Sequence, residues 1–401
     1  MTTSNAFKQH LPVVAAAVRG IILFITVLSI PLASAQALGL SLEQTTGWVM
    51  ALLGVPAVLG LILSFLYRQP LLLTGNLFVI IFINGLGDRY AYAELIGAAM
   101  LAGVLVLLVG LLGISRRLAS LIPVPIMFGL LAGAVMPFIS NFFTSMGDFP
   151  ILVGGTLLVY LLSRGFLGER LPAILPALVM GVVLAALTGQ FGTSERSLAF
   201  VMPALTLPVF SLPVILTATP VFFVLITLQA NLPSLRFLHS QGYHPPERVI
   251  DTVSGLGTIL GSLLGPTGMS LSLPIASLTA GPDSGEQAIR HRAVYIIGIA
   301  AGLTAFFGGV AALLAGIIPR ALLLTLAGLA VVDVLVNALQ QMAHGPLKIG
   351  PMFAFAIGLS KITFLGFDNY FWALVIGTLV SILLEREGLL ELSRQKSAPE
   401  R

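Results

Sequence analysis

Long apolar runs recur along the whole of this 401-residue chain, and they constrain its fold more than any other feature. Segments such as Val13–Ala35, Ile96–Ile114 and Ala293–Ile318 are long enough to cross a hydrocarbon core of ~30 Å as a helix. Only 9% of the residues are charged, against about 25% in ordinary soluble domains. Because this composition cannot build a water-facing surface, we interpret the chain as a polytopic protein of the lipid bilayer.

Turn-forming and charged residues divide the chain into about fourteen candidate spans. In order they cover residues 11–35, 46–66, 70–87, 93–113, 117–139, 149–163, 172–190, 203–234, 248–264, 266–281, 290–316, 319–342, 350–366 and 369–385. These ranges predict an all-α membrane protein. Residues 386–401 are expected to form a cytoplasmic tail.

The distribution of lysine and arginine predicts the orientation. With the N-terminus in the cytoplasm and fourteen alternating spans, sixteen of the twenty basic residues fall on the cytoplasmic side. Arg89, Arg196 and Arg320 fall outside, and Lys361 falls within a span. This asymmetry is the one that positive-inside insertion produces, and it predicts an inner-membrane protein with both termini in the cytoplasm. The net charge of +4 is spread singly over loops, which is not typical of nucleic-acid binding.

Similar landmarks recur in the two halves of the chain. A Thr-Gly pair begins at Thr74 and again at Thr267, 193 residues later. A proline landmark recurs 196 residues apart, at Pro123 and Pro319, and an Ala-Gly pair recurs 195 residues apart. The steady offset predicts two copies of a seven-span unit. Because seven is odd, the second copy is expected to be inverted in the membrane.

Two spans begin with a proline and a Thr-Gly pair, which predicts broken helices. We expect short extended segments over 70–74 and 265–267, followed by half-helices that start near Gly75 and Gly268. Unpaired backbone at membrane depth must be buried in protein or line a wet cavity, so the extended segments are expected to pair with one another. Both half-helices then present unbonded N–H groups, which favour an anion. The alternative is a pair of ordinary kinks where small residues allow close packing.

The candidate substrate-binding residues cluster at these breaks and in the eighth span. Uncharged amides in that span suit a carboxylate or a polar ring edge, although an interhelical contact explains them equally well. Asp333 and Lys361 are charges inside predicted spans, which makes them functional candidates. They are expected to pair with each other, or Asp333 titrates during transport. The substrate-binding candidates are Thr74, Gly75, Asn76, Gln229, Asn231, Thr267, Gly268, Met269 and Ser270.

Enzyme chemistry and resident cofactors are not expected. The chain has no cysteine, no His-Glu-x-x-His and no Gly-x-Ser-x-Gly. We therefore predict neither a metal site nor a cofactor. An intramembrane enzyme is the most remote functional class, because such an enzyme needs a nucleophile with its base, or metal ligands, at membrane depth.

Two segments resemble the benzoate–proton symporter (BenE-type) family, which belongs to the uracil-permease and SLC26-like 7+7 inverted-repeat fold. Asn231-Leu-Pro233 with the downstream Gly-Tyr is similar to that family's Gln-Asn-x-Pro and Gly-Tyr-x-Pro. Pro266-Thr-Gly268 is similar to its Pro-Phe-Gly. The chain departs from the family after Thr74, where a Trp-Ser-Thr-Pro stretch is common, and in the position of Gln229.

The resemblance implies a core domain and a gate domain. The core would come from two interleaved pieces within 1–140 and 203–318, namely spans 1–4 (11–113) and 8–11 (203–316). The gate would come from spans 5–7 (117–190) and 12–14 (319–385). The resemblance places the site between spans 3 and 10, supports Asn231, Thr267 and Gly268 as site positions, and makes a homodimer possible.

The expected function is secondary active transport of a small organic anion. The resemblance implies benzoate or a related aromatic carboxylate, moved with a proton by elevator-type alternating access. The alternative is a carrier of the same fold for an inorganic anion or a nucleobase. Glutamates that nucleobase permeases carry in spans 8 and 10 are absent from this sequence.

Overall fold

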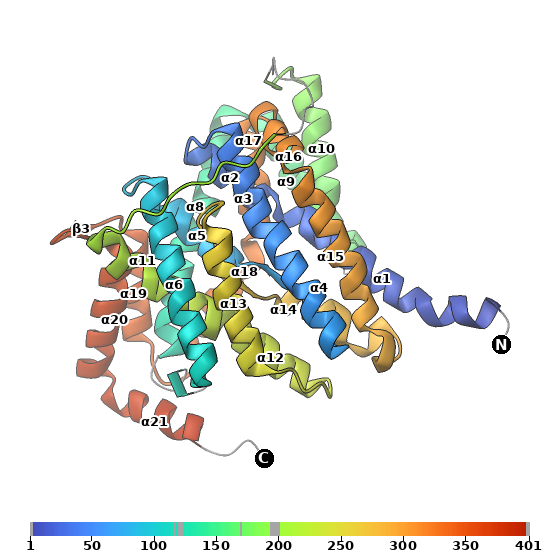
Figure 1. Ribbon diagram of the computed structural model, residues 1–401. Helices are drawn as coiled ribbons and strands as arrows, with labels where there is room; N and C mark the ends of the chain where they lie inside the picture. Colours follow the sequence, from blue (N-terminus) through green and yellow to red (C-terminus); the bar gives the residue numbers. More distant parts are fainter. Residues whose placement is uncertain (1–2, 116, 119–122, 169–170, 193–200, 398–401) are drawn as a thin grey trace.

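The computed structural model describes residues 3–115, 117–118, 123–168, 171–192 and 201–397, and it is almost entirely helical (Figure 1). The first half contains α1 (Thr3–Val27), α2 (Ser29–Ala37), α3 (Leu42–Val49), a π-helical turn (Met50–Gly54), α4 (Val55–Tyr67), β1 (Leu73–Gly75), α5 (Leu77–Leu86), α6 (Tyr92–Leu112), α8 (Val124–Asp148), α9 (Pro150–Leu167) and α10 (Ile174–Leu187).

The second half is also mainly helical and has three short strands. It contains α11 (Leu212–Ile226), a π-helical turn (Thr227–Asn231), α12 (Leu232–Ser240), α13 (Glu247–Ser262), β2 (Met269–Leu271), α14 (Leu273–Ala280), α15 (His291–Phe306), α16 (Gly308–Ile317), α17 (Arg320–Ala330), α18 (Val332–Ala343), α19 (Ile349–Leu359), β3 (Thr363–Phe364), β4 (Phe367–Asp368), α20 (Asn369–Leu384) and α21 (Arg386–Ser397).

The helices have the lengths and apolar character of a multi-pass membrane protein. Among the described residues, seven helical segments are long and apolar enough to cross a membrane. The pair α15–α16, bent by 64°, is an eighth if it forms one span, and four shorter apolar helices accompany them. Each of the fourteen predicted ranges overlaps at least one helix. The predicted all-α membrane class is therefore confirmed.

Three predicted ranges have clearly wrong boundaries. The span predicted over 117–139 continues as α8 to Asp148. The span predicted over 203–234 begins as a helix only at Leu212, and 203–210 instead runs extended across one end of the bundle (Figure 1). Prolines at 203 and 208 remove backbone donors and favour extended neighbours, and Val209 N donates to Ala93 O over 2.9 Å. The span predicted over 350–366 ends as a helix at Leu359, after which β3 and β4 form a hairpin.

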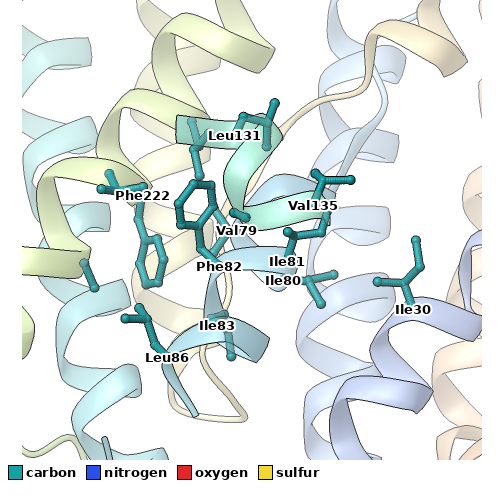
Figure 2. Packing of buried hydrophobic residues seen from close by; sticks show 14 of the residues in the cluster. Ile30, Val79, Ile80, Ile81, Phe82, Ile83, Leu86, Leu131, Val135 and Phe222 are labelled. Carbon is teal, nitrogen blue, oxygen red and sulfur yellow. The ribbon is translucent and has the colours of Figure 1, made fainter. Parts of the chain in front are cut away.

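The half-helix α5 lies at the centre of the largest buried cluster. Its sequence, LFVIIFINGL, is apolar on nearly all sides, which is typical of a helix surrounded by protein. Figure 2 shows its side chains between Ile30 of α2, Leu131 of α8 and Phe222 of α11. Phe82, with 1% of its surface exposed, is among the largest buried side chains. This packing fixes the direction in which α5 leaves β1.

Glycines let α6 and α13 pack with their backbones in contact. A Cβ added at Gly255 of α13 would lie 2.3 Å from Leu107 N of α6. One added at Gly103 of α6 would lie 3.0 Å from Gly255 O. Such small-residue contacts are the usual way for membrane helices to approach closely. This glycine seam between α6 and α13 positions α13, which also contacts β2.

Candidate functional site

The two short strands cross and pair with each other, as the sequence predicts. β1 and β2 are antiparallel, with Thr74 opposite Ser270 and Gly75 opposite Met269. Asn76 N extends the ladder by donating to Gly268 O over 2.7 Å. A Cβ at Gly75 would lie 2.8 Å from Leu52 O, so only glycine fits beside that backbone. The breaks therefore satisfy each other's backbone groups inside the protein.

The half-helices begin later than predicted. Asn76 is the N-cap of α5, and its Oδ1 accepts from Val79 N over 3.2 Å. Ser272 is the N-cap of α14, and its Oγ accepts from Ile275 N over 3.4 Å. The predicted starts at Gly75 and Gly268 are wrong, by two and by five residues, because the strands continue up to these caps.

The two caps are 196 residues apart, as are Thr74 and Ser270 at the centre of the ladder. The prolines that precede α8 and α17 have the same separation. The Thr-Gly pairs, separated by 193 residues, are therefore not equivalent positions. In the ladder, Thr74 lies opposite Ser270 rather than Thr267.

Asn76 ties three elements together. Its Nδ2 donates to Ser270 Oγ over 3.1 Å and to Leu225 O of α11 over 3.2 Å. The side chain is 3% exposed, so its hydrogen-bonding groups are already used inside the protein. Asn76 therefore shapes the crossing and caps α5, which is a positioning role.

Asn231 connects β2 to a buried carboxylate. Its Oδ1 accepts from Leu271 N over 2.8 Å, and its Nδ2 donates to Asp251 Oδ1 over 2.8 Å and to Ser254 Oγ over 3.1 Å. Ser115 donates its hydroxyl to Asp251 Oδ2. Asp251 is 2% exposed and was missed by the sequence reasoning, although it is an acidic residue within the span predicted over 248–264. Both oxygens of its carboxylate accept a hydrogen bond, one from Asn231 and one from Ser115.

The remaining predicted residues lie at the crossing or next to it. Met269 N donates to Thr258 Oγ1 over 2.9 Å, and the Met269 side chain packs at Gly257, inside the helices. Thr267 is fully buried, with its hydroxyl 3.4 Å from Gly268 O. Gln229 is half-buried in the second π-helical turn, and its amide has no hydrogen-bond partner among the described residues. Gln229 is thus a predicted polar side chain with free bonding capacity, and the half-buried Thr74 hydroxyl likewise has no hydrogen-bond partner among the described residues.

The open donors at the crossing are backbone amides. Leu77 and Phe78 are the first residues of α5, and their N–H groups have no acceptor among the described residues. Leu273 opens α14 in the same way, and Pro274 after it has no N–H. Because the ladder is only three pairs long, both N-termini lie beside the same crossing. Neither α5 nor α14 contains a charged residue, so this positive potential comes from peptide dipoles.

The predicted pair of Asp333 and Lys361 is wrong. Asp333 Oδ1 instead lies 2.6 Å from Arg164 Nη2, and Lys361 Nζ lies 3.7 Å from Asp88 Oδ2. Lys361 is not in a span, because α19 ends at Leu359 and Lys361 occupies a turn with φ +55°. The two charges therefore belong to separate regions of the fold.

Asp368 is a second buried carboxylate, placed just before α20. Its Oδ1 accepts from Tyr370 N over 2.9 Å and from Phe371 N over 3.2 Å, which caps the helix. Its Oδ2 is buried without a partner among the described residues. Burial raises the pKa of Asp368 to about 6, although the two backbone donors and the charge of Arg89 act in the opposite direction.

Known proteins similar to this chain are membrane proteins. The sequence model of the family described as benzoate membrane transport protein (BenE) matches residues 7–383. The benzoate membrane transport protein of Acinetobacter baylyi is 27% identical over 357 residues, which cover 88% of this chain and 89% of that protein. The inner membrane protein YdcO of Escherichia coli is 26% identical over 353 residues, which cover 86% and 88%.

Two solved structures share the fold. The transmembrane domain of the cyanobacterial bicarbonate transporter BicA has a TM-score of 0.50 at 18% identity, with 96% of this chain and 98% of that chain covered. The murine anion transporter Slc26a9 in its inward-facing state has a TM-score of 0.59 at 12% identity, with 96% and 72% covered. These likenesses confirm the predicted SLC26-like membrane fold.

Asp368 makes the stability of the protein depend on pH in a defined direction. Its folded-state pKa of about 6 lies above the ~3.9 of an unfolded aspartate, so the folded state binds the proton more tightly. Stability therefore rises as pH falls from 7.5 toward 4. We expect Asp368→Asn to raise Tm at pH 7.5 and to reduce this pH dependence, measured by thermal unfolding in detergent.

Asp148→Asn is the matched control, because Asp148 is exposed at the end of α8. It should unfold with the pH dependence of the unaltered protein. Identical pH profiles for Asp368→Asn and the unaltered protein would contradict a raised pKa for Asp368.

Proposed function

We propose that this chain, which belongs to the benzoate membrane transport protein family, carries benzoate or a related aromatic carboxylate together with a proton. As a member of that family, it is a multi-pass membrane transporter rather than an enzyme. Its membrane is proposed to be the bacterial inner membrane, as the name of the Escherichia coli relative states for that protein. The observation that carries the proposal is the pair of open helix N-termini at the crossing of β1 and β2.

A carboxylate fits these N-termini chemically. The N–H groups of Leu77, Phe78 and Leu273 donate to an anion, and the half-buried Gln229 amide adds a neutral donor. The half-buried side chain of Phe78 packs at the edge of the same apolar cluster and offers a surface for an aromatic ring. Dipoles without a full cationic charge favour a weakly hydrated monoanion, because a strongly hydrated dianion loses more solvation on entering.

A second candidate substrate is a small inorganic anion. The same backbone donors would bind bicarbonate without using an apolar surface, and the solved structure of similar fold from a cyanobacterium is named as a bicarbonate transporter. The apolar side chains of Leu77 and Phe78 beside the donors favour the aromatic carboxylate. Competition between the two anions distinguishes these candidates.

The proposed transport cycle moves a core domain against a gate domain. The core would comprise 11–113 and 203–316 and would carry the crossing, while the gate would comprise 117–190 and 319–385. Side chains join the two at the end that we assign to the outside. Arg89 donates to Lys361 O and, over 3.2 Å, to Ile362 O, and Asp88 pairs with Lys361. Phe82 and Tyr370 also meet there edge to face, with ring centroids 4.7 Å apart.

These contacts support a state that is closed toward the outside. An elevator-type cycle would break them as the core carries the crossing to the other side. The ion pair is exposed, so its rupture costs little, in the range of about 0–1 kcal/mol.

Asp251 is the proposed proton carrier. Among the described residues, its carboxylate is linked to the crossing by hydrogen bonds. Asn231 donates to Asp251 and accepts from Leu271 N of β2. Protonation would replace an anion by a neutral acid within this chain of hydrogen bonds and so alter how firmly Asn231 holds β2. Asp333, by contrast, is exposed and paired with Arg164.

Uptake into proteoliposomes tests the proposed substrate. With an inward proton gradient, labelled benzoate should accumulate, and unlabelled benzoate should compete better than bicarbonate, sulfate or uracil. Collapse of the gradient should abolish accumulation. Gradient-dependent uptake of bicarbonate, with no uptake of benzoate, would overturn the aromatic-carboxylate proposal in favour of the inorganic anion.

Asp251→Asn tests the coupling role. Asparagine keeps an acceptor for Asn231 and provides a donor for Ser115, but it cannot titrate. We expect loss of gradient-driven accumulation while exchange of internal for external benzoate continues. Asp333→Asn should retain both activities and serves as the matched control. Normal accumulation by Asp251→Asn would place the proton elsewhere.

A further inference from the structure

A hollow separates the end of α4 from the start of α15, away from the crossing. Its volume is about 530 Å³, and its wall includes Phe65, Leu66, Arg68, His291, Arg292 and Tyr295. The two helices that form it also pack against each other along their length. None of these residues takes part in the proposed site at β1 and β2.

The polar side of the hollow is basic. Arg68 makes no hydrogen bond or ion pair with the described residues, and Arg292 Nη1 lies 3.5 Å from His10 Nε2. Arg68 and Arg292 line the same hollow as the His291 ring, so its polar side carries two guanidinium groups. His291 and Arg292 also stand in the first turn of α15, where the helix dipole adds positive potential.

His291 is a buried polar residue rather than an exposed one. Only 8% of the residue is exposed, and its Nδ1 has no hydrogen-bond partner among the described residues. Its ring is held edge to face against Tyr295, with ring centroids 5.4 Å apart. The imidazole is thus a fixed polar part of the wall, next to the guanidinium groups of Arg68 and Arg292.

The other side of the hollow is apolar and open. Phe65 and Leu66 are 69% and 67% exposed at the end of a helix that is long and apolar enough to cross a membrane. A ligand that matches both sides carries a negative, oxygen-rich head and hydrocarbon chains. Arginine binds phosphate oxygens in a fork geometry, and basic pockets between membrane helices bind anionic lipid head groups.

We propose that this hollow binds the head group of an anionic phospholipid of the cytoplasmic leaflet. Arg68 and Arg292 contact the phosphate beside the His291 ring, and Phe65 and Leu66 contact the first part of the acyl chains. The lipid braces the adjacent ends of α4 and α15. The binding is independent of which solute the protein transports.

The test compares the effects of different lipids on the thermal unfolding of the full-length protein in detergent. Tryptophan fluorescence monitors the unfolding. Added phosphatidylglycerol should raise Tm by about 3 °C or more relative to phosphatidylcholine, because a ligand of the folded state stabilises it. In the variant Arg68→Gln/Arg292→Gln, at least half of this gain should disappear. Both arginines are exposed, so the variant should fold, and its Tm in phosphatidylcholine checks this.

Arg236→Gln/Arg248→Gln is the matched control, because it removes two exposed arginines predicted for the same membrane side. It should keep the full gain from phosphatidylglycerol. The proposal is overturned if Arg68→Gln/Arg292→Gln keeps the full gain, or if the control loses as much. It is also overturned if inorganic phosphate alone gives the same gain, since the hollow would then take free phosphate.

Discussion

A bilayer offers no water to unpaired backbone groups, and this constraint explains why the two breaks in the chain occur together. A single extended segment at membrane depth would leave several N–H and C=O groups unsatisfied. Here β1 and β2 pair with each other, and Asn76 N completes the ladder at Gly268 O. Among the described residues, the first amides of α5 and α14 stay open at this crossing, so the geometry that pairs the two strands also leaves donors for an anion.

The surrounding helices hold the crossing of β1 and β2 in place through neutral side chains and tight helix packing. Asn76 bonds to Ser270 and to the backbone of α11, while Asn231 bonds to β2 and to Asp251. The glycine seam between α6 and α13 places Thr258 where its hydroxyl accepts from Met269 N. Polar groups buried in this way are satisfied by one another, which keeps the site neutral apart from Asp251.

Periodicity and turn residues predicted the apolar helices, the two broken spans and the pairing of their extended segments. They failed on register, because Thr-Gly pairs recur 193 residues apart while the caps Asn76 and Ser272 are separated by 196. Dipeptide matches carry no information on which residues face each other across a ladder. The predicted pairing of Asp333 with Lys361 failed since partner choice depends on where α19 ends. Asp251 was visible as an acid in a predicted span, but its link to Asn231 is tertiary.

The central claim is that backbone amides at the start of α5 bind the transported anion. Leu77→Pro removes one of these N–H groups at the first helical position, where proline is tolerated after the extended Asn76. Leu77→Ala removes the side chain and keeps the N–H. We expect Leu77→Pro to raise the Kd for benzoate by about 10-fold or more, because a hydrogen bond to a charged group is lost, and Leu77→Ala to change it by less than about 3-fold. Equal affinities for the two variants, measured by equilibrium binding to the purified protein, would contradict it.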